Sequence, residues 1–187
     1  MLTAISQILT AFGLSTASGL NAYIPLLIVA LTARFTDWIK LSPPFDILAN
    51  EWVIAALIVL LVIEIIVDKI PAADTLNDLI QTFVRPTAGA ILFAASANVI
   101  SDLHPIIAAI LGLILAFGVH ATKTAARPVV TAATGGVGNP IVSLLEDVVA
   151  TILSILAIVL PIVMAILLGI VIALLARWWL RRKSVLA

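Results

Sequence analysis

The chain has 187 residues, of which 63% are hydrophobic and only 11% are charged, whereas a soluble domain carries about twice that share of charge. With a mean hydropathy of +1.27, this composition predicts an integral membrane protein that has the lipid bilayer as its surroundings. A net charge of zero gives no sign of a nucleic-acid partner, and the absence of cysteine excludes disulfides and thiolate chemistry.

The first half of the chain predicts three helical regions. Residues 3–33 are long and apolar enough for one crossing, interrupted inside by GLSTASGLNAYIP at residues 13–25. After a polar loop at residues 34–51, residues 52–67 form the most uniformly apolar span. Residues 73–84 alternate polar and apolar positions at helical spacing, which predicts an amphipathic helix lying at the interface.

The second half predicts four more crossings. A short helix rich in Ala, Gly and Ser follows Pro86 over residues 87–100, and an apolar span covers residues 106–122. Residues 128–156 contain TAATGGVGNPIVSLLED, whose glycines and proline we expect to interrupt a helix in the middle of its crossing. A last span runs to about residue 179.

The predicted fold is therefore an all-α, polytopic membrane helix bundle over residues 1–187, with about six crossings, two interrupted helices and one interfacial amphipathic helix. With both termini on one side, every basic residue except Arg34 and Lys40 lies on that side, which predicts cytoplasmic termini. Arg-Pro recurs at 85–86 and 127–128. The segments GLNAYIP near the start and GVGNPIV later share the order Gly, Asn, Pro before an apolar run. These matches reflect either an internal duplication or chance recurrence in an apolar chain.

Three segments together resemble one bacterial membrane-protein family, catalogued as domain of unknown function 4126. They are GLSTASGLNAYIPLLIVALTARF, IPAADTLNDLIQTFVRPTAGAIL and TAATGGVGNPIVSLLEDVV. The resemblance covers nearly the whole chain and implies a multi-pass protein of the bacterial inner (plasma) membrane. Family members often have Phe and Arg where this chain has Leu20 and Asn21, and the resemblance supplies no activity.

Ionisable residues in apolar helices are costly and need a partner or a wet cavity. Two acidic pairs have i,i+4 spacing, and basic residues are expected on the same side of the membrane. The predicted charge network is Glu64, Asp68, Asp74, Asp78, Arg85, Lys123 and Arg127. It either pins helix ends at the interface or forms a cytoplasmic gate or a headgroup site.

The two expected breaks leave backbone groups that lipid cannot satisfy, so we expect the breaks to meet at one cavity near the bilayer midplane. The substrate-binding residues predicted there are Asn21, Tyr23, Gly135, Gly136, Gly138, Asn139, Glu146 and Asp147. The asparagines are alternatively interhelical hydrogen-bonding groups. Glu146 and Asp147 are adjacent and point about 100° apart on a helix, so they are not both expected at one cavity.

These features predict a transporter or channel for a small solute, an ion or a lipid. The alternative is a non-transporting membrane scaffold or an accessory subunit of a larger complex. No nucleophile with an activating base is evident, so we expect no enzyme, no catalytic residue, no cofactor and no metal centre. The small size of the chain favours a homo-oligomer.

Overall fold

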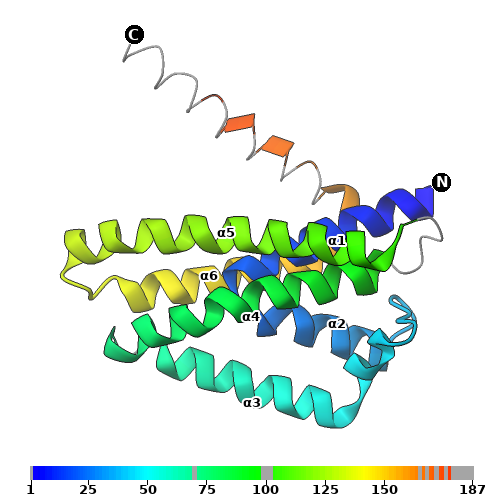
Figure 1. Cartoon of the computed structure of the whole chain (residues 1–187), viewed down its shortest axis with the longest axis horizontal. Coiled ribbons are helices and arrows are strands. Elements are labelled where there is room, and N and C mark those ends of the chain that lie inside the picture. Colours follow the sequence, from blue (N-terminus) through cyan, green and yellow to red (C-terminus); the bar gives the residue numbers. More distant parts are fainter. Residues whose placement is uncertain are drawn as a thin grey trace.

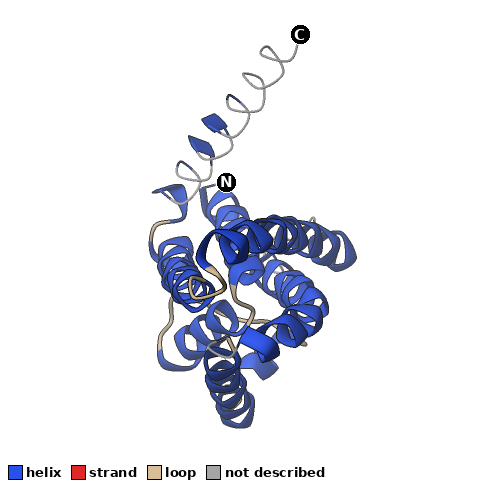
Figure 2. Cartoon of the chain, turned by 90° about the vertical axis from the view of Figure 1, so that its left-hand side faces the viewer, coloured by secondary structure: helices blue, strands red, loops and turns tan. Residues whose placement is uncertain are grey.

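In the computed structural model, the described residues are 2–68, 71–97 and 103–163, with a few more between 166 and 177. They form α1 (Leu2–Leu20), α2 (Tyr23–Phe35), the short 3-10 helix η1 (Phe45–Ala49), α3 (Glu51–Val67), α4 (Pro71–Ala97), α5 (Pro105–Thr134) and α6 (Asn139–Val159). The described residues contain no strand, so the predicted all-α fold is confirmed (Figure 1). Seen from the end that carries the α5–α6 turn, the helices run roughly along the line of view (Figure 2).

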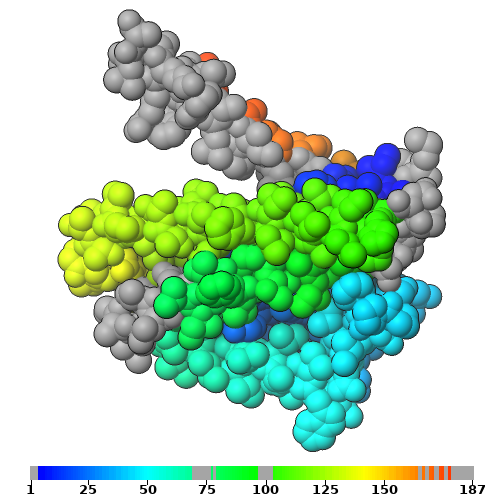
Figure 3. Space-filling model, in the orientation of Figure 1, coloured from blue at the N-terminus to red at the C-terminus, as the bar shows by residue number. Residues whose placement is uncertain are grey.

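The centre of the bundle is α1, which packs against α4, α5 and α6. In the space-filling view, α4 and α5 cover most of it (Figure 3). Small residues permit this close approach: Ser15 Oγ donates to the carbonyl of Gly89 at 2.9 Å, and a Cβ on Gly89 would collide with Gly112 of α5. The small-residue face of α4 is thus used inside one chain, and the expected homo-oligomer stays a prediction.

The chain reverses its direction between α1 and α2. Thr10 of α1 bonds to Ala157 near the end of α6, and Asn21 bonds to Asp147 nearer the start of α6, so α1 and α6 are antiparallel. At the far end of α2, Arg34 reaches the carbonyl of Ala49, just before α3 begins. Figure 1 shows α2 running back toward the end of the bundle where α1 begins.

This reversal corrects two expectations. Residues 3–33 are not one interrupted crossing, because the Asn21 side chain ends α1 and accepts hydrogen bonds from the backbone of Tyr23 and Ile24 at the start of α2. Asparagine is well suited to this capping role. The N-terminal end of α1 consequently lies with Arg34, at the end of the bundle opposite the α5–α6 turn, and not on the side of Lys123 and Arg127 as expected (Figure 1).

The second expected break is also a turn between two helices. Gly135 and Gly136 have φ values of 62° and 87°, a left-handed conformation that glycine adopts without steric cost. The backbone N–H of Gly136 donates to the carbonyl of Thr131 at 3.1 Å, which closes the end of α5. Pro140 then lies in the first turn of α6. The chain therefore turns here at the end of the bundle and does not interrupt a crossing.

Two prolines expected to separate helices lie inside them instead. Pro86 is within α4, so the amphipathic segment at residues 73–84 and the small-residue helix after it form one continuous helix. Pro128 is likewise within α5, which extends past the expected end near Lys123 to Thr134. Each proline removes one backbone donor, which helices in lipid tolerate where neighbouring groups compensate.

The bundle is apolar on its outside, and its interior combines an apolar core with a polar region. On α4, Phe83 is 72% exposed and Leu79 and Ile80 are also exposed, whereas Gln81 and Arg85 are each only 1% exposed. Among the described residues, α5 and α6 are each long and apolar enough to cross a membrane. This distribution is typical of a membrane helix bundle, and the expected number of about six crossings stays a prediction.

Candidate functional site

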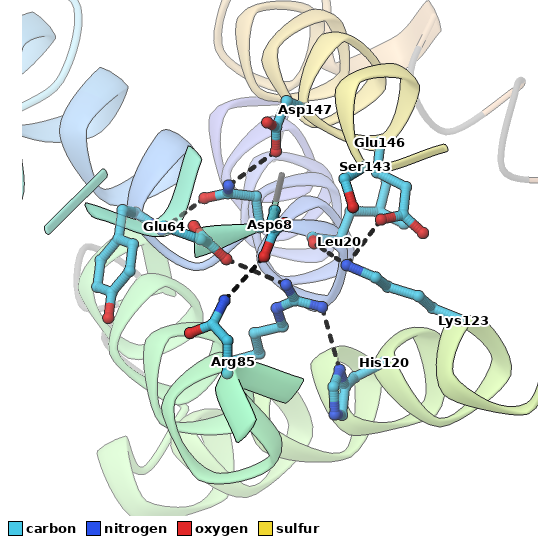
Figure 4. A network of polar contacts seen from close by, with 12 residues as sticks. Leu20, Glu64, Asp68, Arg85, His120, Lys123, Ser143, Glu146 and Asp147 are labelled. Atoms are coloured by element: carbon cyan, nitrogen blue, oxygen red, sulfur yellow. Dashed lines mark hydrogen bonds and ion pairs between the residues drawn. The ribbon is translucent and has the colours of Figure 1, made fainter. Parts of the chain in front are cut away.

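Polar side chains from four helices and from Asn21 meet inside the apolar bundle (Figure 4). All except the exposed Thr124 are buried or half-buried. The helical members come from α3, α4, α5 and α6 or directly follow α3, and Asn21 directly follows α1. We call this cluster the polar core; it consists of Asn21, Glu64, Asp68, Asn77, Gln81, Thr82, Arg85, His120, Lys123, Thr124, Arg127, Ser143, Glu146 and Asp147.

Arg85 of α4 joins α3 to α5. Its Nη2 donates to Glu64 Oε1 at 3.0 Å, and both side chains are only 1% exposed. Its Nη1 lies 3.2 Å from His120 Nδ1. A guanidinium group only donates, so His120 Nδ1 accepts and the ring proton lies on Nε2. The His120 ring is therefore neutral in this arrangement.

A repeated Thr-x-x-Arg-Pro motif holds the other side of the His120 ring. Thr82 precedes Arg85-Pro86, and Thr124 precedes Arg127-Pro128. The hydroxyls of Thr82 and Thr124 lie 3.0 Å and 3.5 Å from His120 Nε2, and their oxygens can accept a hydrogen bond from its N–H group. Sequence reasoning had noted the two Arg-Pro pairs and missed His120. The threonine three residues before each arginine is the signal that points to it.

The second part of the polar core joins α5 to α6. Lys123 Nζ lies 2.7 Å from Glu146 Oε2 and 3.4 Å from the backbone carbonyl of Leu20, the last residue of α1. Arg127 Nη2 donates to Ser143 Oγ at 2.7 Å and lies 3.5 Å from the same carboxylate oxygen of Glu146. Figure 4 shows Lys123 and Glu146 pointing toward one another from their two helices.

Two amide–carboxylate pairs complete the cluster. Asn21 Nδ2 donates to Asp147 Oδ1 at 2.8 Å, and Asn77 Nδ2 donates to Asp68 Oδ1 at 2.9 Å. The adjacent acids on α6 therefore diverge, as their angular separation on a helix requires, because Glu146 faces α5 and Asp147 faces the end of α1.

The predicted site residues divide into two groups. Asn21, Glu146 and Asp147 belong to the polar core, and Tyr23 lies beside Gln81 and Glu64. The residues of the α5–α6 turn lie at the end of the bundle, away from Asn21, so the two expected breaks do not meet in one cavity: Gly135, Gly136, Gly138 and Asn139. The carboxamide of Asn139 instead bonds to the Thr131 hydroxyl at 3.0 Å.

Most of the predicted charge network converges. Glu64, Arg85, Lys123 and Arg127 take part in buried ion pairs, and Asp68 bonds to Asn77. The side chains of Asp74 and Asp78 lie outside the described residues. In the described part of the chain, no three acidic or histidine side chains gather as metal ligands.

Three buried polar atoms in one region have no hydrogen-bond partner among the described residues. They are Glu64 Oε2, Gln81 Oε1 and Arg85 Nε. Buried polar groups are nearly always paired, and leaving one unpaired costs about 1–3 kcal/mol. Gln81 and Arg85 are four residues apart on one face of α4, so these atoms mark a place where a polar ligand would gain hydrogen bonds.

The family model described as domain of unknown function (DUF4126) matches residues 8–182. The chain belongs to this family. The resemblance inferred from the three sequence segments is thereby confirmed over nearly the full length. The comparison with curated proteins and the comparison with solved structures each found no match. The DUF4126 description carries no activity, so the function is argued from the polar core.

Proposed function

We propose that this chain is a multi-pass protein of the bacterial inner membrane that moves a small polar solute or an ion, with the polar core as its binding site. Ionisable side chains inside a membrane are expensive and mark solute pathways and proton relays. The observation that carries the proposal is the buried Glu64–Arg85–His120 chain, which leaves an acceptor on Glu64 and a donor on Arg85 unpaired among the described residues.

The polar core offers both signs of charge to a ligand. Arg85 supplies a fixed cation, Glu64 supplies a carboxylate oxygen, and the Gln81 carbonyl oxygen is a further acceptor. A ligand with both donors and acceptors therefore fits better than an apolar one. The neutral His120 ring adds a proton-accepting atom only when Arg85 moves away from it.

The basic residues support one orientation in the membrane. Arg85, Lys123 and Arg127 lie on the side of the polar core, whereas Arg34 and Lys40 lie near the other end of the bundle. Because lysine and arginine within about 15–20 residues of the helix ends are in excess on the cytoplasmic side, this orientation has the α3–α4 and α5–α6 turns in the cytoplasm. The N-terminal end of α1 then faces away from the cytoplasm.

The proposal is tested with purified full-length protein in proteoliposomes on a solid-supported membrane. Concentration jumps of protons, sodium, potassium, chloride and phosphate are applied, and the transient current is compared with that of empty liposomes. We expect a saturable current for at least one of these ions. Correctly folded protein that gives no current with any of them contradicts the proposal for these ions.

A second candidate function is a non-transporting scaffold. The observation that favours it is the mutual pairing of most charges, since the Lys123–Glu146 and Glu64–Arg85 pairs also tie four helices together. A scaffold would copurify with a partner at fixed stoichiometry. It would also keep that partner when Glu64 and Arg85 are replaced together by leucine and methionine, because apolar replacement of a whole buried pair is often tolerated.

A further inference from the structure

The described side chains of the polar core carry one negative charge in excess. The carboxylates are Glu64, Asp68, Glu146 and Asp147, the cations are Arg85, Lys123 and Arg127, and the His120 ring is neutral. A net charge inside an apolar bundle is expensive, so this imbalance favours the uptake of a cation.

The excess negative charge lies around Glu64. Elsewhere in the cluster, two cations pair with the single carboxylate of Glu146. In the described part of the chain, Asp68 and Asp147 bond instead to the neutral amide groups of two asparagines, and the charges of both act on Glu64. Of these three neighbouring carboxylates, only that of Glu64 forms an ion pair with a described residue, Arg85.

The Glu64 carboxyl group has a place for a proton. Its side chain is 1% exposed, and its Oε1 accepts a hydrogen bond from Arg85 Nη2 at 3.0 Å. Its Oε2 has no partner among the described residues. A proton on Oε2 therefore leaves the bond to Arg85 in place and turns Oε2 into a hydrogen-bond donor.

Gln81 Oε1 is the acceptor that this new donor requires. It is the other buried acceptor oxygen without a partner in the described part of the chain. Tyr23 of α2 connects the two side chains, because its hydroxyl bonds to the Gln81 side chain and the Glu64 charge acts on it. One proton thus converts two unpaired acceptors into one hydrogen bond.

We propose that the polar core binds one proton on Glu64 Oε2, and that the resulting O–H group donates to Gln81 Oε1. A hydronium ion gives up the proton and leaves as water, the carboxylate loses its negative charge, and no bond within the protein breaks. The inference rests on the proposed function, because it names the ion that the polar core takes up. A metal cation fits less well, since no three acidic or histidine side chains of the described residues gather as ligands.

His120 is not the proton site in this arrangement. Its Nδ1 accepts from Arg85 Nη1, so a second ring proton at Nδ1 would face a donor. The charged and titratable groups that face Glu64 are Asp68 at the end of α3, Arg85 of α4, Asp147 of α6 and Tyr23 of α2, and from α5 His120 faces it through Arg85.

The experiment is infrared difference spectroscopy of the full-length protein between about pH 9 and about pH 6, in a detergent without ester or carboxyl groups. Exposed carboxyl groups stay ionised in this range, because their ordinary pKa values are about 4. At the lower pH we expect a protonated-carboxyl C=O band in the wild type and in Glu51→Gln, a control that removes an exposed carboxylate. Glu64→Gln should lack the band. A wild type without the band, or folded Glu64→Gln with the same band, would overturn the proposal.

Gln81→Met tests the acceptor and keeps the proposal testable if Glu64→Gln does not fold. Methionine has no carbonyl oxygen, so the O–H group of Glu64 loses its hydrogen bond and the C=O band should move to higher frequency. An unmoved band would overturn the pairing with Gln81.

These spectra detect proton binding and not proton movement. The band together with no current for any ion in proteoliposomes would contradict the proposed function alone. A saturable current without the band would contradict the proton site alone.

Discussion

Replacing Arg85 by alanine should be the most damaging single change among the buried ion pairs. The Arg85 side chain is 1% exposed and donates to Glu64 at 3.0 Å and to His120 at 3.2 Å. Its loss leaves a buried carboxylate without a counter-charge, and breaking such a pair costs about 3–5 kcal/mol. For a chain of this size, about 1 kcal/mol corresponds to about 2–4 °C, so the melting temperature should fall by roughly 6–20 °C.

The assay is thermal unfolding of purified protein in one detergent, with a matched control. Arg34→Ala removes an ion pair with Glu51 at 3.4 Å and a hydrogen bond to the Ala49 carbonyl at 3.0 Å, but the Arg34 and Glu51 side chains are 38% and 73% exposed. Exposed pairs contribute about 0–1 kcal/mol, so this control should melt close to the wild type. In a double-mutant cycle, the variant with both Glu64→Ala and Arg85→Ala should lose much less stability than the sum of the losses of the two single variants. Equal melting of Arg85→Ala and Arg34→Ala would refute the reasoning.

Three further predictions concern the ends of the helices. Asn21→Leu leaves Asp147 and two backbone donors without their partner, so it should lower the free energy of unfolding by about 1–3 kcal/mol in chemical denaturation; unchanged stability would contradict the cap. Gly136→Leu should destabilise the α5–α6 turn by about 1–3 kcal/mol because of its positive φ, yet leave proteoliposome currents intact; lost currents in folded protein would instead place the turn at the site. The chain has no cysteine, so Val137→Cys should react with a membrane-impermeant maleimide only from the cytoplasm and Thr36→Cys only from outside; the reverse pattern would invert the proposed orientation.

The all-α fold and the charged members of the polar core were predictable from the sequence. The composition predicts an apolar helix bundle. Glu64 is conspicuous because it interrupts an apolar span, and Arg85 because it follows an acidic amphipathic segment. A charged side chain inside an apolar bundle needs a partner, and in the structure Glu64 and Arg85 pair with each other.

The direction of the chain at Asn21 and at Gly135 was not predictable. Glycine, asparagine and proline in an apolar run are equally typical of an interrupted membrane helix and of a tight turn between two helices. Which of the two forms depends on hydrogen bonds between helices, such as the one from Asn21 to Asp147, which lie 126 positions apart in the sequence. Periodicity within one segment carries no information on such contacts.

The role of His120 was missed for a related reason. A single histidine three residues before Lys123 is indistinguishable from a residue near a membrane boundary. Its partners Thr82 and Arg85 come from a different helix, and only the antiparallel packing of α4 and α5 brings them together.

The transient current of Glu64→Gln proteoliposomes tests the central claim most directly, with Glu51→Gln as the matched control. Both changes remove one carboxylate with little change in shape, but Glu64 is buried in the polar core and Glu51 is exposed at the start of α3. With equal protein density, the ion that gives a wild-type current should give a wild-type current with Glu51→Gln and a much smaller one with Glu64→Gln. A current that Glu64→Gln leaves unchanged would show that the polar core only holds the helices together.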